Sequence, residues 1–109
     1  FRGECDVRIG RATDAVINDA QLAQLAQEAI APVAGEGFLQ TVMTPNMGSE
    51  DFSEYLALRP GAFYFLSSAA DESTRISHHN PRFNIDERVL WKGSAVFVSI
   101  VEEFLNKGE

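Results

Sequence analysis

The chain has 109 residues, 45% of them hydrophobic and 23% charged, and this balance is typical of a single globular unit. Its net charge of −7 and its nine scattered Lys and Arg residues argue against nucleic acid and anionic membranes as partners. No apolar run approaches the roughly 20 residues that a membrane span requires, and the first residues lack signal-peptide organisation. Cys5 is the single cysteine, so we expect no internal disulfide and a reducing, cytoplasmic location.

The first predicted elements are a strand and a helix. Residues 4–9 alternate polar and apolar side chains, which predicts a strand with one buried face. Asn18 and Asp19 follow at a suitable place to cap a helix over residues 20–35, where apolar side chains recur every three or four residues. Pro32 should fray or bend the last turn of this helix.

The middle of the chain predicts two further strands around a short helix. Residues 38–43 are apolar and partly β-branched, which favours a strand. Ser49 can cap a short helix that runs to about residue 58. Residues 62–66 form an almost continuous apolar run, which indicates a central strand buried on both faces.

The last part of the chain predicts a long loop and a long helix. Residues 67–84 are polar and lack periodicity, and loops of this length are usually functional or disordered. The final helix should begin near Asp86 and run to about Asn106. Its apolar side chains should share one face that belongs to the core; these are Val89, Leu90, Gly93, Phe97, Ile100, Val101, Phe104 and Leu105.

The alternation of strands and helices predicts the fold class. The order strand, helix, strand, helix, strand, helix indicates an α/β architecture, a partial layered sheet with flanking helices in which some strands are parallel.

Two histidines in the polar loop are the first candidates for chemistry. His78 and His79 precede Pro81 in a loop after an apolar strand, where α/β proteins place ligand-binding residues. Extended backbone would send the two side chains to opposite sides, so we expect only one of them to face a site. Two neighbouring histidines in a loop are more often solvated than metal-bound, and a zinc site needs further ligands that these residues do not supply.

Glu50, Asp51 and Arg82 are the other candidates. Both carboxylates lie at the start of the predicted short helix, where acidic residues commonly do no more than favour the positive end of the helix. Arg82 could hold an anionic substrate group or a neighbouring carboxylate, although an exposed, solvated arginine is the commoner case.

Three motifs, taken together in order, resemble a known family. They are MGSEDF at residues 47–52, PGAFYFL at residues 60–66 and HNPRFN at residues 79–84. This arrangement resembles the amidohydrolases of the aminoacylase and glutamate-carboxypeptidase metallopeptidase family, which includes hippurate hydrolase, N-acetyl-diaminopimelate deacetylase and the hydrolases of indoleacetyl-amino acids. The resemblance extends over nearly the whole chain.

The resemblance implies a position at the C-terminal end of a di-metal aminopeptidase-like protein. Residues 1–17 would be the last strand of the lid or dimerisation domain with its return linker. Residues 18–109 would be the C-terminal part of the catalytic metallohydrolase domain. On this basis we expect a homodimer or a self-associating fragment, with the missing N-terminal half of the same protein as a partner.

The resemblance also implies roles for individual residues. His79, not His78, matches the C-terminal metal ligand of the family, and Glu50 and Asp51 match its acidic motif near the site. We expect these two residues, together with Arg82, to support the ligands or orient the substrate. The complete protein would hold two divalent ions (zinc, manganese or cobalt) and hydrolyse small N-acyl amino acid substrates with a metal-activated water. The family's other ligands and its general base lie in segments that precede this chain, so we expect no catalytic residue here and no activity from this chain alone.

A second hypothesis belongs to a different class of function. The chain could be a non-catalytic α/β fragment or interaction module that keeps the family's shape without its metals, because one candidate ligand falls short of the roughly four that structural zinc requires.

Overall fold

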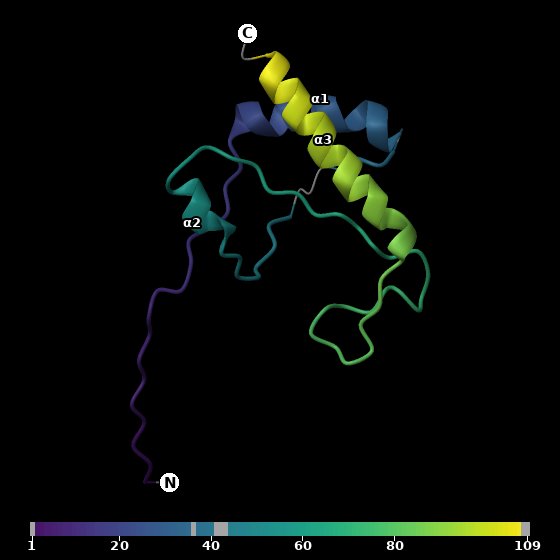
Figure 1. Ribbon diagram of the computed structural model, residues 1–109. Coiled ribbons are helices and arrows are strands. Elements are labelled where there is room, and N and C mark those ends of the chain that lie inside the picture. The colour runs from purple at the N-terminus through teal and green to yellow at the C-terminus, as the bar shows by residue number, and fades with distance from the viewer. Residues whose placement is uncertain (1, 36, 41–43, 108–109) are drawn as a thin grey trace.

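Two long helices packed against each other form the centre of the molecule. The computed structural model describes residues 2–35, 37–40 and 44–107. In these ranges the elements are α1 (Ala20–Ala34), α2 (Phe52–Leu56), the 3₁₀-helix η1 (Glu87–Val89) and α3 (Leu90–Asn106). Helix α3 crosses and packs on α1, while residues before α1 form an arm that leads away from the helices (Figure 1).

Helix α1 follows directly from its capping residues and its apolar face. The Asp19 carboxylate accepts hydrogen bonds from the backbone N–H groups of Gln21 and Leu22, at 3.0 and 2.9 Å. Gly35, with a φ of 86°, ends the helix. The prediction of this helix is confirmed, and the helix continues past Pro32 to Ala34. Its buried side chains are Ala26, Ala29 and Ile30.

Two polar contacts join α1 to α3 across long stretches of sequence. The Ser99 hydroxyl donates a hydrogen bond of 2.8 Å to the carbonyl oxygen of Ala29. The Lys107 ammonium lies 2.7 Å from a carboxylate oxygen of Glu28. The last helical segment has the bounds that the sequence predicted. Asp86 is the N-cap of η1, and α3 continues from Leu90 to Asn106.

The predicted α/β sheet is wrong for the described residues, which contain helices and no strand. Residues 4–9, 38–40 and 62–66 lack a ladder partner, and residues 41–43 of the second predicted strand lie outside the described residues. A strand exists only where a second backbone satisfies its N–H and C=O groups. Alternating side chains predict which side of a segment is buried, but they do not supply that second backbone.

The apolar run at residues 62–66 instead lies extended against the start of α1. The Asn18 side chain brackets the backbone of Phe63, accepting from its N–H at 2.8 Å and donating to its carbonyl at 3.0 Å. The Tyr64 hydroxyl donates to the carbonyl oxygen of Ala23 at 2.9 Å. Phe65 remains largely exposed, so burial on both faces is also wrong for this segment.

Two further details of the predicted helices are corrected. Helix α2 is shorter than expected and has Asp51, not Ser49, at its N-cap. Helix α3 meets α1 through the side that carries Ser99, whereas five members of its predicted core face are exposed, namely Leu90, Phe97, Val101, Phe104 and Leu105. The spacing predicted an apolar face correctly, but α3 is apolar around more of its circumference than one contact with α1 can bury.

The buried core is small for the length of the chain. Among the described residues, those classed as buried are Ala26, Ala29, Ile30 and Ser53. The radius of gyration is 18.3 Å, whereas a compact domain of this length has about 13 Å.

Within the described ranges, none of the helices combines the length and apolar character needed to cross a bilayer.

Candidate functional site

The two histidines lie in a tight polar turn between the extended segment and η1. Asn80 organises this turn, because its side-chain oxygen accepts from the backbone N–H of Arg82 and its carbonyl accepts from the N–H of Phe83, both at 2.9 Å. His79 has a φ of 65°, in the left-handed region that non-glycine residues seldom occupy. Both histidines and Arg82 are exposed.

The turn brings the imidazoles of His78 and His79 together. Their ring centroids lie 4.7 Å apart, edge to face, at an interplanar angle of 72°. The expectation that the two side chains point to opposite sides is therefore wrong. It assumed extended backbone at both positions, whereas the left-handed conformation of His79 rotates its side chain toward its neighbour.

The acidic pair lies at the start of α2 and has local partners. One Glu50 carboxylate oxygen accepts a hydrogen bond of 3.1 Å from the backbone N–H of Phe52. The Ser53 hydroxyl donates to the carbonyl of Glu50 at 3.1 Å. Asp51 is exposed and caps α2 through its backbone, without a side-chain bond. Glu50 thus stabilises the helix start, whereas the Asp51 carboxylate is not engaged by the cap.

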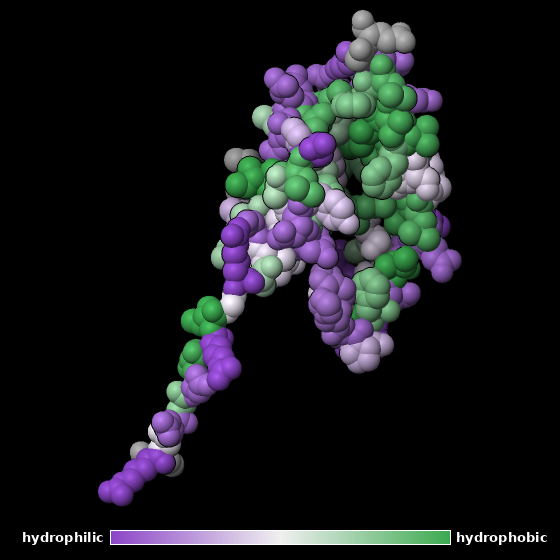
Figure 2. All heavy atoms as spheres, turned by 60° about the vertical axis from the view of Figure 1, so that its left-hand side comes forward, coloured by the Kyte–Doolittle hydropathy of each residue, from purple (hydrophilic) through white to green (hydrophobic). Residues whose placement is uncertain are grey.

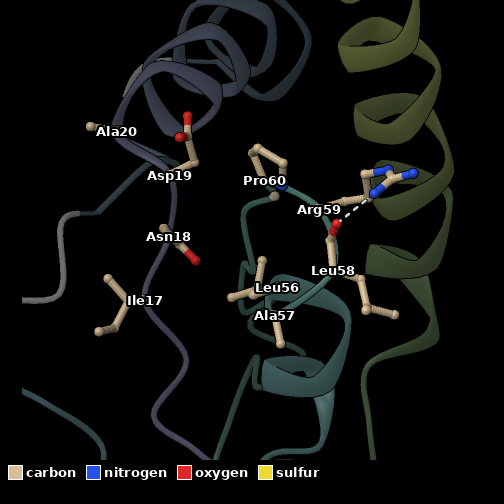
Figure 3. A pocket seen from close by; sticks show the side chains of 10 residues that line it. Ile17, Asn18, Asp19, Ala20, Leu56, Ala57, Leu58, Arg59 and Pro60 are labelled. Carbon is tan, nitrogen blue, oxygen red and sulfur yellow. Dashed lines mark hydrogen bonds between the residues drawn. The ribbon is translucent and has the colours of Figure 1, made fainter.

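A hollow on the surface is formed by other residues. It measures about 510 Å³ and lies between the start of α1 and the turn that follows α2, where Figure 3 shows Asn18 and Asp19 facing Leu56 and Pro60. Asn18 is engaged with the Phe63 backbone and Asp19 with the first N–H groups of α1. None of the four predicted site residues lines this hollow.

Sequence reasoning missed the role of Asn18 and the pairing of Asp86 with Arg88. The local pattern favours a capping role for Asn18, yet its side chain binds the backbone of Phe63, 45 residues away, which no local pattern reveals. The Arg88 guanidinium donates hydrogen bonds to both carboxylate oxygens of Asp86, and this contact lowers the pKa of Asp86. Asp86 and Arg88 line a second hollow together with Lys92. Because Arg88 is paired with Asp86, Lys92 is the other positive charge in the lining of this hollow.

Comparison with known sequences assigns the chain to a family. The profile of peptidase family M20/M25/M40 matches residues 3–103, which include the motifs around Glu50 and His79. The chain belongs to this peptidase family. The resemblance inferred from the three motifs is therefore confirmed.

Individual relatives of this M20-family chain are named as hydrolases. A probable hydrolase of Synechocystis sp. is 37% identical over 85% of the chain and 24% of its own length. An IAA-amino acid hydrolase ILR1-like protein of Arabidopsis thaliana is 37% identical over 82% of the chain and 19% of its own length. A thermostable carboxypeptidase of Saccharolobus solfataricus is 34% identical over 58% of the chain and 16% of its own length. No solved structure matches the chain significantly.

The described residues do not by themselves form a metal centre. Peptidases of the M20 family are generally metal-dependent. Within residues 2–35, 37–40 and 44–107, however, no three His, Cys, Asp or Glu side chains gather as a cation site would require. The exposed imidazole of His79 could be one ligand of a metal site whose other ligands come from elsewhere. The structure does not bring Glu50 and Asp51 to His79 as further ligands. The chain spans between about a fifth and a quarter of the length of the first two relatives.

Proposed function

We propose that this chain is part of a metal-dependent amidohydrolase that cleaves the amide bond of N-acyl amino acids, and that His79 supplies one ligand to its metal centre. The observation that carries the proposal is the family match, because it runs through the loop that contains His79. The name of the Arabidopsis relative, an IAA-amino acid hydrolase, supports an amino acid conjugate as the substrate class.

The backbone of His79 gives independent support for a functional role. A non-glycine residue in the left-handed region costs on the order of 1–3 kcal/mol, and such residues cluster at active sites and ligand clamps. His79 occupies this conformation in a turn whose geometry Asn80 fixes. The result is an exposed imidazole on a backbone turn of defined geometry, which suits a ligand that completes a site formed mainly by other segments.

The remaining candidates take supporting roles in this proposal. Two divalent ions (zinc, manganese or cobalt) would lower the pKa of water and polarise the scissile carbonyl when bound. Asp51, whose carboxylate is not used by the α2 cap, is better placed to orient a ligand or substrate than Glu50, which binds the Phe52 N–H. Arg82, exposed beside the histidines, would attract the carboxylate of an amino acid substrate.

The proposal extends to the context of the chain. Residues 1–17 would belong to a lid or dimerisation domain and residues 18–109 to the catalytic domain. The arm ends at Asn18, the residue whose side chain is hydrogen-bonded to the backbone of Phe63, and this position supports the boundary between residues 17 and 18. The single cysteine, Cys5, supports a reducing cytoplasmic location.

The test compares the two adjacent histidines in the full-length protein. We expect His79→Ala to reduce turnover of an N-acetyl amino acid by more than about 100-fold and to release roughly one metal ion per subunit, because loss of an outer-shell partner alone costs about 10–100-fold. His78→Ala is the matched control, since it removes an exposed imidazole from the same turn, and it should leave the metal content unchanged. Metal content by mass spectrometry, measured beside the rate, separates ligand loss from misfolding.

The reverse pattern would contradict the assignment. If His78→Ala releases the ion while His79→Ala keeps full metal content and rate, the ligand is the preceding residue. If neither change alters metal content or rate, the non-catalytic reading of this loop is correct.

A further inference from the structure

The loop that carries His79 is closed at its base by a hydrogen bond. The backbone N–H of Asp86 donates to the carbonyl oxygen of Ser68 at 2.8 Å, and residues 69–85 between them contain neither helix nor strand. The loop lies below the lower end of α3 (Figure 1), apart from the broad hydrophobic area on the helical part of the molecule (Figure 2). Its backbone groups therefore depend on side chains and turns for their partners.

The first turn of this loop is capped by Thr74. The hydroxyl oxygen of Thr74 accepts hydrogen bonds from the backbone N–H groups of Ala70 and Asp71, at 2.8 and 3.1 Å. The Asp71 carboxylate reinforces the same turn by accepting from the N–H of Ser73 at 2.8 Å. None of these bonds involves His79 or the residues next to it, so this turn is a comparison for the second one within the same loop.

The second turn is held by both oxygens of Asn80. The side-chain oxygen accepts from the backbone N–H of Arg82 and the carbonyl oxygen accepts from the N–H of Phe83, both at 2.9 Å. Pro81 follows Asn80 at the position of a turn where the fixed φ of proline is favourable. His79 is the residue that enters this turn, so its backbone is restrained on the C-terminal side.

The conformation of His79 depends on restraint of this kind. Its φ of 65° lies in a region that few non-glycine residues occupy, and such a conformation persists where the surrounding structure determines it. The imidazole contacts the ring of His78, and both rings are exposed, so packing around the side chain provides little restraint. The turn that Asn80 holds is the adjacent element that can fix the backbone of His79.

We propose that Asn80 is a positioning residue for the metal centre, because it keeps His79 in the backbone conformation from which the imidazole binds the ion. The proposal rests on the proposed function, since it takes His79 as a ligand. A ligand that occupies its binding conformation for only part of the time binds more weakly in the same proportion. Loss of the Asn80 side-chain oxygen should therefore weaken metal binding although every ligand is still present.

The test measures the affinity of the full-length protein for zinc by competition with a chelator. We expect Asn80→Ala to weaken zinc binding about tenfold, at the lower end of the roughly 10–100-fold that partners of metal ligands contribute. Asn80→Ser should recover most of the affinity, because a serine hydroxyl accepts from the same backbone N–H, although less strongly. Both replacements suit the extended backbone that precedes a proline.

Thr74→Val is the matched control for a general effect on the loop. It keeps the size and charge of the side chain but removes the acceptor of two backbone N–H groups. If Asn80 acts through His79, Thr74→Val should leave the zinc affinity unchanged. A role of Asn80 in the stability of the loop alone would give the two variants similar affinities.

The backbone of His79 can also be observed directly, without metal and without substrate. At positive φ the amide and α protons of one residue lie close together and give a strong intraresidue nuclear Overhauser effect. Histidine labelled with ¹³C at the carbonyl and ¹⁵N at the amide selects the His78–His79 peptide, which is the single His–His step of the 109 residues. The effect should be strong in the unaltered protein and in Thr74→Val, and weaker in Asn80→Ala.

Three results would overturn the proposal. Asn80→Ala that binds zinc as tightly as the unaltered protein, while His79→Ala does not, would remove the role of Asn80 and leave the proposed function standing. Equal losses in Asn80→Ala and Thr74→Val, or an Asn80→Ser variant no better than Asn80→Ala, would show that the acceptor at position 80 has no particular role. Unchanged zinc affinity in His79→Ala would overturn the proposed function itself, and this inference with it.

Discussion

Asp19 and Asp51 occupy the same formal position, the N-cap of a helix, but only one of them uses its side chain there. The Asp19 carboxylate accepts two backbone hydrogen bonds at the start of α1. Asp51 makes no side-chain bond to α2. The comparison separates a residue whose carboxylate stabilises the fold from one whose carboxylate is available for another purpose.

We predict that Asp19→Ala lowers the free energy of unfolding by about 1 kcal/mol, because two N–H groups of α1 lose their acceptor. Asp51→Ala should change stability by less than about 0.5 kcal/mol. Urea denaturation followed by circular dichroism measures both changes. Equal losses for the two variants would show that the Asp19 bonds contribute nothing specific.

The candidate residues themselves could be named from the sequence, but their geometry could not. The order of three motifs predicts His79 as the candidate ligand, and the family match includes the motif that contains it. The edge-to-face contact of His78 and His79 depends on the φ of 65° at His79. Histidine enters the left-handed region more often than most non-glycine residues do, but this remains a minority conformation that a sequence cannot assign to one position. Its role as a metal ligand stays a prediction.

At the scale of elements, the contact between α1 and α3 ends in a cluster of charges. Lys107 pairs with Glu28 of α1 at 2.7 Å and with Glu103 of α3 at 3.1 Å. The hydrogen bond to Glu28, followed by that to Glu103, raises the pKa of Lys107. The hydrogen bond from Lys107, followed by that from Gln24, lowers the pKa of Glu28. Both groups are solvent-exposed, so their contribution to stability is small.

The direction of each shift predicts how this contribution depends on pH. The pKa of Glu28 is lowered, so its stabilisation is present above its ordinary value of 4.5 and is lost as pH falls through the lower value in the folded chain. The pKa of Lys107 is raised, so its stabilisation is present below 10.5 and is lost as pH rises through the higher folded value. The pair therefore stabilises the helices between these limits.

Lys107→Met should lower the thermal midpoint of the chain slightly at neutral pH and not at all in strong acid or strong alkali. Arg75→Met, which removes an exposed pair within the loop, is the control and should have no such pH-dependent effect on the helices. Added salt should reduce the difference at neutral pH. A difference between Lys107→Met and the unaltered chain that is constant across pH would mean that the aliphatic part of Lys107, not its charge, is responsible.

The helices were predictable and the strands were not, for a physical reason. Helix α1 contains its own hydrogen-bond partners, and its start at Asp19 and its end at Gly35 are encoded in adjacent residues. Residues 62–66 could become a strand only beside another strand, and their sequence carries no information on whether one is present. The same limit explains α3, whose spacing predicted an apolar face without revealing that most of it is exposed in the described structure.

For the whole molecule, the shortage of metal-binding groups leads to a prediction about the chain by itself. A single imidazole cannot offset the dehydration of a divalent ion, and the described residues offer no group of three donors. We expect titration calorimetry with zinc to show binding no tighter than that of an exposed histidine, and we expect no measurable hydrolysis of an N-acetyl amino acid. His79→Ala in this isolated chain should barely alter the titration. A tight site of one zinc per chain would contradict the proposal that the other ligands lie elsewhere.

The pairing of α1 with α3 also has a consequence for synthesis on the ribosome. Glu28 and Lys107 are 79 residues apart, and Ala29 and Ser99 are 70 residues apart. At about 5–20 residues per second, roughly 4–16 s pass between translation of the first member of the charged pair and translation of the second. Contacts of such separation also carry a large loop-closure cost, which slows their formation after release. Throughout this interval the apolar face of α1 lacks the helix that covers it, so a nascent chain stalled between the two helices should be a substrate for chaperones that bind exposed apolar segments.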